Sequence, residues 1–218
     1  MTYLMRKITP LRWTQEQHDI HSNEDINAES LSDLCADENA ISTWNVGEKT
    51  EENIIKAVTA LASGFRSLDE LSIVLIDDDM IKKAGLSISE TEGFTKIKDY
   101  SHLHRDIDQL NAKQLVSLAG IILNSVWNGE VIAINAEELS MWLLKKINEG
   151  KLKFLDLDKN FRVAFSGKIK RLINKKKIQL EELDEELQRD LQAQWQLNQR
   201  GNTMCQNAGN CVNFLRAS

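Results

Sequence analysis

The order of apolar and polar residues predicts strands in the first half of the chain. Apolar side chains lie among polar ones over residues 2–9, and a second apolar stretch over residues 41–46 ends at Gly47. Residues 71–76 are almost entirely apolar, which is typical of a strand that is buried on both faces of its sheet. Residues 131–134 fit either a short strand or a connector.

Other segments repeat apolar residues every three or four positions, which predicts helices. Thr50 is a suitable N-cap for a helix over residues 51–63, whose first turn begins with two glutamates. Asn111 and Asn135 are each followed three residues later by Gln or Glu, so each forms a capping box that opens a further helix. The last apolar repeat consists of Leu180, Leu183, Leu187, Leu191 and Trp195. It predicts one amphipathic helix of about five turns.

Shorter or less regular segments complete the prediction. Residues 28–35 and 77–85 each fit a short helix, and the second begins with three aspartates. Residues 87–101 are polar and irregular, so we expect a surface loop there. Residues 202–218 are rich in asparagine and small side chains, so we expect a poorly ordered tail.

Together these elements predict an α+β protein. We expect a mixed sheet with packed helices over residues 1–134, followed by a helical, charge-segregated domain over residues 135–201 and the tail over residues 202–218. The boundary is placed near residue 135 because the composition changes there from mixed strands and helices to helical and basic.

Composition is typical of a soluble globular protein. Of 218 residues, 42% are hydrophobic and 28% are charged, which is enough apolar material for a sizeable core. No stretch approaches about 18 uninterrupted apolar residues, and the first ten residues lack the long apolar region of a signal peptide. We therefore expect a cytoplasmic protein without a membrane partner.

Charge is segregated along the chain. The formal net charge is −6, yet residues 145–177 contain twelve basic and only three acidic side chains, whereas residues 1–100 contain 10 basic and 19 acidic ones. Such segregation indicates a charged partner, either within the chain or in another molecule.

Two interpretations of the basic segment remain open. In the first, residues 175–177 end a helix and the acidic residues 181–186 begin the next, so the two blocks neutralise each other. In the second, the segment contacts the phosphates of a nucleic acid or the carboxylates of an acidic partner. The residues that would make this contact are Lys168, Lys170, Arg171, Lys175, Lys176 and Lys177.

One motif resembles a catalytic loop. His104, Arg105 and Asp106, followed by Asn111, match the pattern of the protein-kinase catalytic loop. The chain has no glycine-rich loop and no Asp-Phe-Gly motif in the following residues, so we interpret these residues as a polar turn before a helix.

Three consecutive aspartates follow the apolar segment at residues 71–76. Carboxylates at the end of a strand can hold Mg²⁺ and orient phosphates, so a metal-dependent phosphoryl-transfer or nuclease activity would depend on Asp77 and Asp79. A helix N-cap with acidic residues in the first turn explains the same sequence, and we favour it because no Walker A loop is present.

The cysteines and histidines do not predict a metal centre. Cys35, Cys205 and Cys211 are an odd and widely spaced set, as expected of free thiols, and the four histidines have polar neighbours. We therefore predict no catalytic residue, no metal and no cofactor.

The function that best explains this sequence is non-enzymatic binding of another protein in the cytoplasm, as in an immunity protein, an antitoxin or an accessory subunit. The basis is a net negative charge without a catalytic set, together with five tryptophans, a residue favoured at interfaces. The alternatives are a nucleic-acid-binding regulator that uses residues 145–177 and a metal-dependent phosphoryl or nuclease enzyme that uses Asp77 and Asp79.

Overall fold

A computed structural model describes residues 1–13, 26–34 and 37–193 of the chain. Within these ranges, the centre is a six-stranded sheet of order β4-β5-β2-β1-β3-β6, in which every neighbouring pair is antiparallel. The strands are β1 (Tyr3–Ile8), β2 (Ile41–Gly47), β3 (Leu71–Asp77), β4 (Ser87–Glu90), β5 (His104–Asp108) and β6 (Val131–Ile134). The α+β prediction is confirmed, with antiparallel pairing throughout the described sheet where a mixed sheet was expected.

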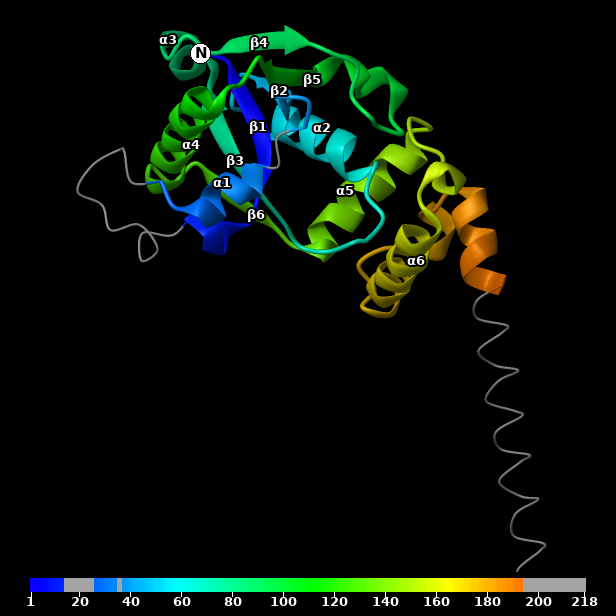
Figure 1. Ribbon diagram of the computed structural model, residues 1–218. Coiled ribbons are helices and arrows are strands. Elements are labelled where there is room, and N and C mark those ends of the chain that lie inside the picture. Colours follow the sequence, from blue (N-terminus) through cyan, green and yellow to red (C-terminus); the bar gives the residue numbers. More distant parts are fainter. Residues whose placement is uncertain (14–25, 35–36, 194–218) are drawn as a thin grey trace, which may run out of the picture.

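Helices cover both faces of this sheet (Figure 1). Helices α2 and α5 pack on one face, whereas α1, α3 and α4 pack on the other. The helices are α1 (Ala28–Leu34), α2 (Glu51–Ala62), α3 (Asp78–Lys83), α4 (Ala112–Trp127), α5 (Ala136–Asn148) and α6 (Lys159–Asn174). Residues 185–193 form a further helix. Short 3₁₀ helices are η1 (Pro10–Trp13), η3 (Lys98–Leu103), η4 (Phe154–Asp156) and η5 (Leu180–Glu182).

Strand β1 supplies side chains to both faces. Met5 belongs to the cluster under α2 and α5, whereas Leu4 and Ile8 belong to the cluster under α1 and α4. Successive side chains of a strand point to opposite faces of its sheet. The mixture of apolar residues in β1 therefore reflects a strand that is covered on both sides.

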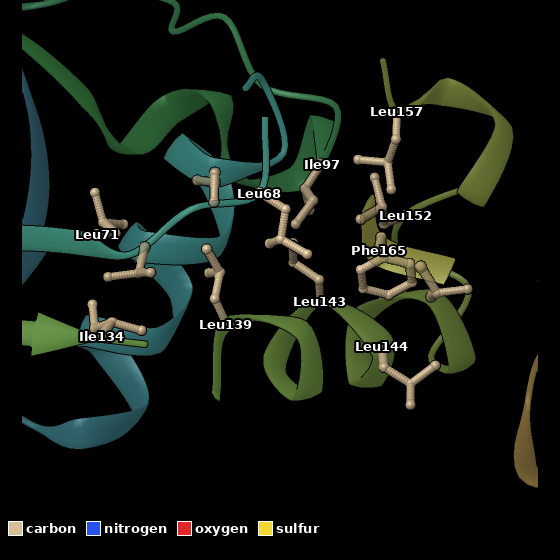
Figure 2. Close-up of a cluster of buried hydrophobic side chains, with 14 of the residues drawn as sticks. Leu68, Leu71, Ile97, Ile134, Leu139, Leu143, Leu144, Leu152, Leu157 and Phe165 are labelled. Atoms are coloured by element: carbon tan, nitrogen blue, oxygen red, sulfur yellow. The ribbon is translucent and has the colours of Figure 1, made fainter. Parts of the chain in front are cut away.

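The larger of the two clusters continues from the sheet into the C-terminal helices. Figure 2 shows Leu139 and Leu143 of α5 on the side that faces Leu68 and Ile97. The same cluster contains fully buried residues of α6 and of the last described helix, namely Phe161, Phe165, Leu187 and Leu191. One core thus includes residues on both sides of position 135, and the division into two domains stays a prediction.

The segment 87–101 is not the surface loop that its polarity predicted. It contains β4 and the beginning of η3, and both Ile97 and Tyr100 are buried. Strand β4 is at an edge of the sheet and is held by its pairing with β5. Because an edge strand with partly exposed side chains needs little apolar character, its sequence resembles that of a loop.

The leucine stripe from Leu180 is also not one continuous helix. The backbone at Leu183 is extended, with φ −87° and ψ 153°, so η5 ends there. A carboxylate oxygen of Asp184 then accepts a hydrogen bond from the backbone N–H of Glu186 at 2.9 Å, as an N-cap does for a new helix. Leu187 continues the buried stripe, whereas Trp195 lies outside the described residues, as does the tail at 202–218.

Removing the Phe165 ring tests how α6 is attached. The ring is fully buried, with its centroid 6.2 Å from that of Phe154 and 6.4 Å from that of Phe161. We expect Phe165→Ala to lower the free energy of unfolding by about 3–5 kcal/mol, because the substitution removes buried apolar surface and leaves a cavity. Urea denaturation measures this change.

The matched control is Val163→Ala on the same helix, since Val163 is 62% exposed. This control should change the free energy of unfolding by less than about 0.5 kcal/mol. Similar small effects of both substitutions would contradict the packing of α6 on the core.

Candidate functional site

Both ends of helix α5 have the residues that are typical of helix termini. The side-chain oxygen of Asn135 accepts hydrogen bonds from two backbone N–H groups of the first turn, at 3.0 and 2.9 Å. Two glutamates occupy that first turn and two lysines the last, which suits the helix dipole. The chain leaves the helix through Gly150, whose φ of +69° favours glycine. The helix predicted after Asn135 is therefore confirmed.

The outward side of α5 forms a ridge of exposed residues. Its inward residues, such as Leu139 and Leu143, are fully buried, and Figure 2 shows Leu144 on the other side of the helix from them. The exposed residues, which we call the α5 ridge, are Met141, Lys145, Asn148 and Glu149. Residues three and four apart share one face of a helix. The ridge is therefore a continuous surface along α5.

An apolar hollow of about 390 Å³ lies on one flank of the α5 ridge. Its lining residues are Met141, Leu144, Lys145, Asn148, Glu149, Ile178, Glu182 and Leu183. Asn148 holds the opposite wall in place. Its side-chain N–H donates to the carbonyl of Glu182 at 2.8 Å, and its side-chain oxygen accepts from the backbone N–H of Asp184 at 3.2 Å. The wall at residues 178–183 is thus fixed to the helix.

A second hollow of about 530 Å³ lies on the other flank, and we call it the lysine hollow. Its lining residues are Glu51, Glu52, Ile55, Lys56, Tyr100, Trp142, Lys145, Lys146, Glu149 and Lys151. Lys146 is only 7% exposed, with its Nζ 3.2 Å from a carboxylate oxygen of Glu149 and 5.8 Å from the centroid of the Tyr100 ring. The two hollows adjoin, because Lys145 and Glu149 line both.

Lysines of the lysine hollow lower the pKa of two of its glutamates. Lys151, 3.0 Å away, and then Lys146 lower the pKa of Glu149. Lys56, 2.8 Å away, lowers the pKa of Glu52, with smaller contributions from more distant lysines of α5. Both carboxylates therefore remain ionised at neutral pH.

The basic segment finds an internal partner that differs from the expected one. Lys175 lies 3.0 Å from one carboxylate oxygen of Glu137, and Lys177 pairs with the other. Residues 175–177 were expected to meet the acidic residues 181–186 instead. Glu137 is at the beginning of α5, so these ion pairs join the end of α6 to the beginning of α5.

The remaining residues of the predicted nucleic-acid or acidic-partner contact lie along α6 and just after it. Lys168, Lys170 and Arg171 are on α6, and Lys176 follows it with a φ of +56°. Arg171 and Lys176 are exposed, and Lys168 is half-buried. None of these four residues lines either hollow, and their role in binding stays a prediction.

The residues that resemble a kinase catalytic loop are part of the sheet. His104, Arg105 and Asp106 begin β5, which pairs with β2 and β4, so the expected polar turn is wrong for these three. Asn111 caps α4 as predicted, in a reciprocal capping box with Gln114. A strand between two neighbours does not present these groups as a catalytic loop does.

Asp106 and His104 instead form a structural network with Thr91. The Thr91 hydroxyl donates to Asp106 at 2.8 Å and lies 2.7 Å from Nδ1 of His104. Since that hydroxyl has one proton, Nδ1 carries the hydrogen and donates to Thr91. Burial lowers the pKa of His104, so its neutral form is favoured. The network joins the segment after β4 to β5.

The three aspartates behave as the N-cap interpretation predicted. Asp77 caps α3 by accepting a hydrogen bond from the backbone N–H of Asp79 at 3.0 Å, and Asp78 pairs with Lys82 at 2.7 Å. One oxygen from each carboxylate lies within 4.8 Å of the others. A metal-dependent activity of Asp77 and Asp79 stays a prediction.

Comparison with known proteins adds no further information: no protein-family model, no curated protein and no solved structure matches the chain. None of the helices in the described ranges is long and apolar enough to cross a membrane. Cys35, Cys205 and Cys211, together with two of the four histidines, lie outside the described residues.

Sequence reasoning did not find the two hollows. It did locate α5 and its lysines. The spacing of four residues between Met141 and Lys145 places both on one face of the helix, and this was a signal that could have indicated the surface. The walls of the hollows come from distant parts of the chain, namely α2, Tyr100 and residues 178–183. No local pattern identifies such walls.

The ion pairs of Glu137 predict an acid-sensitive link. Hydrogen bonds from Lys177 and Lys175 lower the pKa of Glu137 from 4.5 to about 2. Because this pKa is lowered in the folded state, the link stabilises the fold above pH 4.5 and is lost as the pH falls toward 2. An NMR titration of the Glu137 side-chain carboxyl group measures the pKa directly.

The control for this titration is the double variant Lys175→Ala and Lys177→Ala, in which the pKa of Glu137 should return toward 4.5. A pKa near 4.5 in the unaltered protein would contradict the observed ion pairs.

Proposed function

We propose that the chain is a non-enzymatic, cytoplasmic protein-binding protein of the immunity-protein, antitoxin or accessory-subunit type, and that its partner docks on the α5 ridge. The observation that carries this proposal is the apolar hollow beside exposed Met141. Its opposite wall is held to α5 by both polar atoms of the Asn148 side chain. A partner would therefore meet a preformed surface, which lowers the entropic cost of binding.

The residue types on this surface support a protein partner. Met141 has a flexible, polarisable side chain of the kind that adapts to varied binding partners. On the other flank, Trp142 and Tyr100 line the lysine hollow, and both residue types are common anchors in interfaces. Apolar side chains beside a charged border match the usual anatomy of a protein–protein interface.

The arrangement of the two hollows favours a polypeptide over a compact small molecule. The α5 ridge separates the hollows, and Lys145 and Glu149 line both of them. A ligand that fills both must therefore cross the helix. A chain segment can do so by placing neighbouring side chains on opposite sides of the ridge.

Replacing Met141 by aspartate tests the proposal. We expect Met141→Asp to reduce capture of the partner by tagged protein from its source cells by roughly tenfold or more, because a charge replaces an apolar contact at the interface. Quantitative affinity purification with mass spectrometry measures the loss. Met141 is 37% exposed, so the variant should retain the melting temperature of the parent.

The matched control is Val163→Asp, which places the same charge on an exposed apolar residue of α6. This control should retain the partner. A partner that stays bound to Met141→Asp, or is lost equally from both variants, would contradict docking on the α5 ridge.

A second candidate function is nucleic-acid binding through the basic segment. The observation that favours it is the position of Arg171 and Lys176 on the exposed surface at the C-terminal end of α6. Binding that weakens steeply with salt, and that is removed by Arg171→Ala with Lys176→Ala but not by Met141→Asp, would support this function instead.

A further inference from the structure

Lys145 is the charged residue of the α5 ridge that forms no ion pair among the described residues, although its charge helps to lower the pKa of Glu52. It is exposed and lines both hollows. The other three lysines of the lysine hollow pair with Glu52 or Glu149. Lys145 has no ion-pair partner among the described residues. Its ammonium group is therefore available to an incoming anion.

The surroundings of Lys145 would strengthen its contact with an anion. The hollow is lined by four lysines and three glutamates, and its lysines lower the pKa of Glu52 and of Glu149. Trp142 and the nearly buried Tyr100 ring line the same space. An ion pair that is partly shielded from water by such rings is screened less than one on the open surface.

From this charge complementarity, we propose that the partner segment on the α5 ridge is acidic: one of its carboxylates enters the lysine hollow beside Lys145, and a neighbouring apolar side chain enters the apolar hollow. This inference rests on the proposed function and specifies the chemistry of the partner. The segment crosses the helix at Lys145. The aliphatic stem of that side chain packs beneath it while the ammonium group pairs with the carboxylate.

The two hollows also account for selectivity. An apolar side chain gains burial against Met141, Leu144 and Ile178. A carboxylate gains an ion pair that an amide of the same shape does not form. A basic side chain placed beside Lys145 meets a like charge there, which disfavours it. The surface therefore selects a short segment in which acidic and apolar residues are close together.

A library of random peptides displayed on phage is the first probe. The full chain serves as the target, and binders that also bind the uncharged variant Met141→Ser are removed. The remaining peptides should be enriched in aspartate or glutamate beside leucine, isoleucine, methionine or an aromatic residue. An enrichment in basic residues would overturn the inference.

Affinity measurements then test the role of Lys145. Fluorescence anisotropy compares a selected peptide with a matched peptide in which every acidic residue is replaced by its amide. The unaltered protein should bind the amide peptide roughly tenfold more weakly, the loss expected for one charged hydrogen bond. Lys145→Ala should remove this difference between the two peptides. Lys153→Ala, at an exposed lysine outside both hollows, should preserve it.

The outcomes separate the two proposals. If the library contains no binder that depends on Met141, docking on the α5 ridge fails and this inference fails with it. If such binders exist but lack acidic residues, or prefer acids equally well with Lys145→Ala, only the inference fails. Unchanged melting temperatures show that neither result comes from unfolding.

Discussion

The rest of the structure depends on the position of helix α5. Its inner side completes the core that joins the sheet to the C-terminal helices, and its outer side is exposed to solvent. Leu139 and Leu143 are fully buried on its inner side, in the cluster that also contains Phe165 and Leu187. Figure 1 shows α5 between the sheet and α6. Because neighbours hold the helix on its other sides, its outer ridge is presented in one fixed position, which favours binding without reorganisation.

Acidic residues at the two ends of α5 neutralise part of the positive charge of the segment 145–177. Glu137, at the beginning of the helix, pairs with Lys175 and Lys177, and Glu149, just after its end, pairs with Lys146 and Lys151. Exposed pairs such as those of Glu137 contribute little individually to stability, so their main effect is to position the segments that they join. Internal pairing thereby accounts for part of an unusual basic stretch, and Lys145 remains directed outward.

Local signals explain which parts of the fold could be predicted. Thr50, Asn111 and Asn135 cap the helices that their sequences predicted, because a cap depends only on the next few residues. Strand β4 was missed because pairing with β5 stabilises it, and the apparent helix from Leu180 is interrupted by an N-cap at Asp184.

The site was missed because its parts are distant in sequence. Lys175 and its partner Glu137 are 38 residues apart, and the wall opposite α5 is held by a contact between Asn148 and Asp184 across 36 residues.

The central claim is that the outer ridge of α5 is a docking surface for an acidic protein segment. Its most direct test is a photo-crosslinking amino acid placed at position 141 of the full chain, with the crosslinked peptide identified by mass spectrometry. The same amino acid at position 163, another exposed apolar position, is the reference. The structure predicts that position 141 crosslinks reproducibly to an acidic segment of one partner protein and that position 163 does not. No crosslink at position 141 beyond that at position 163 would contradict the claim.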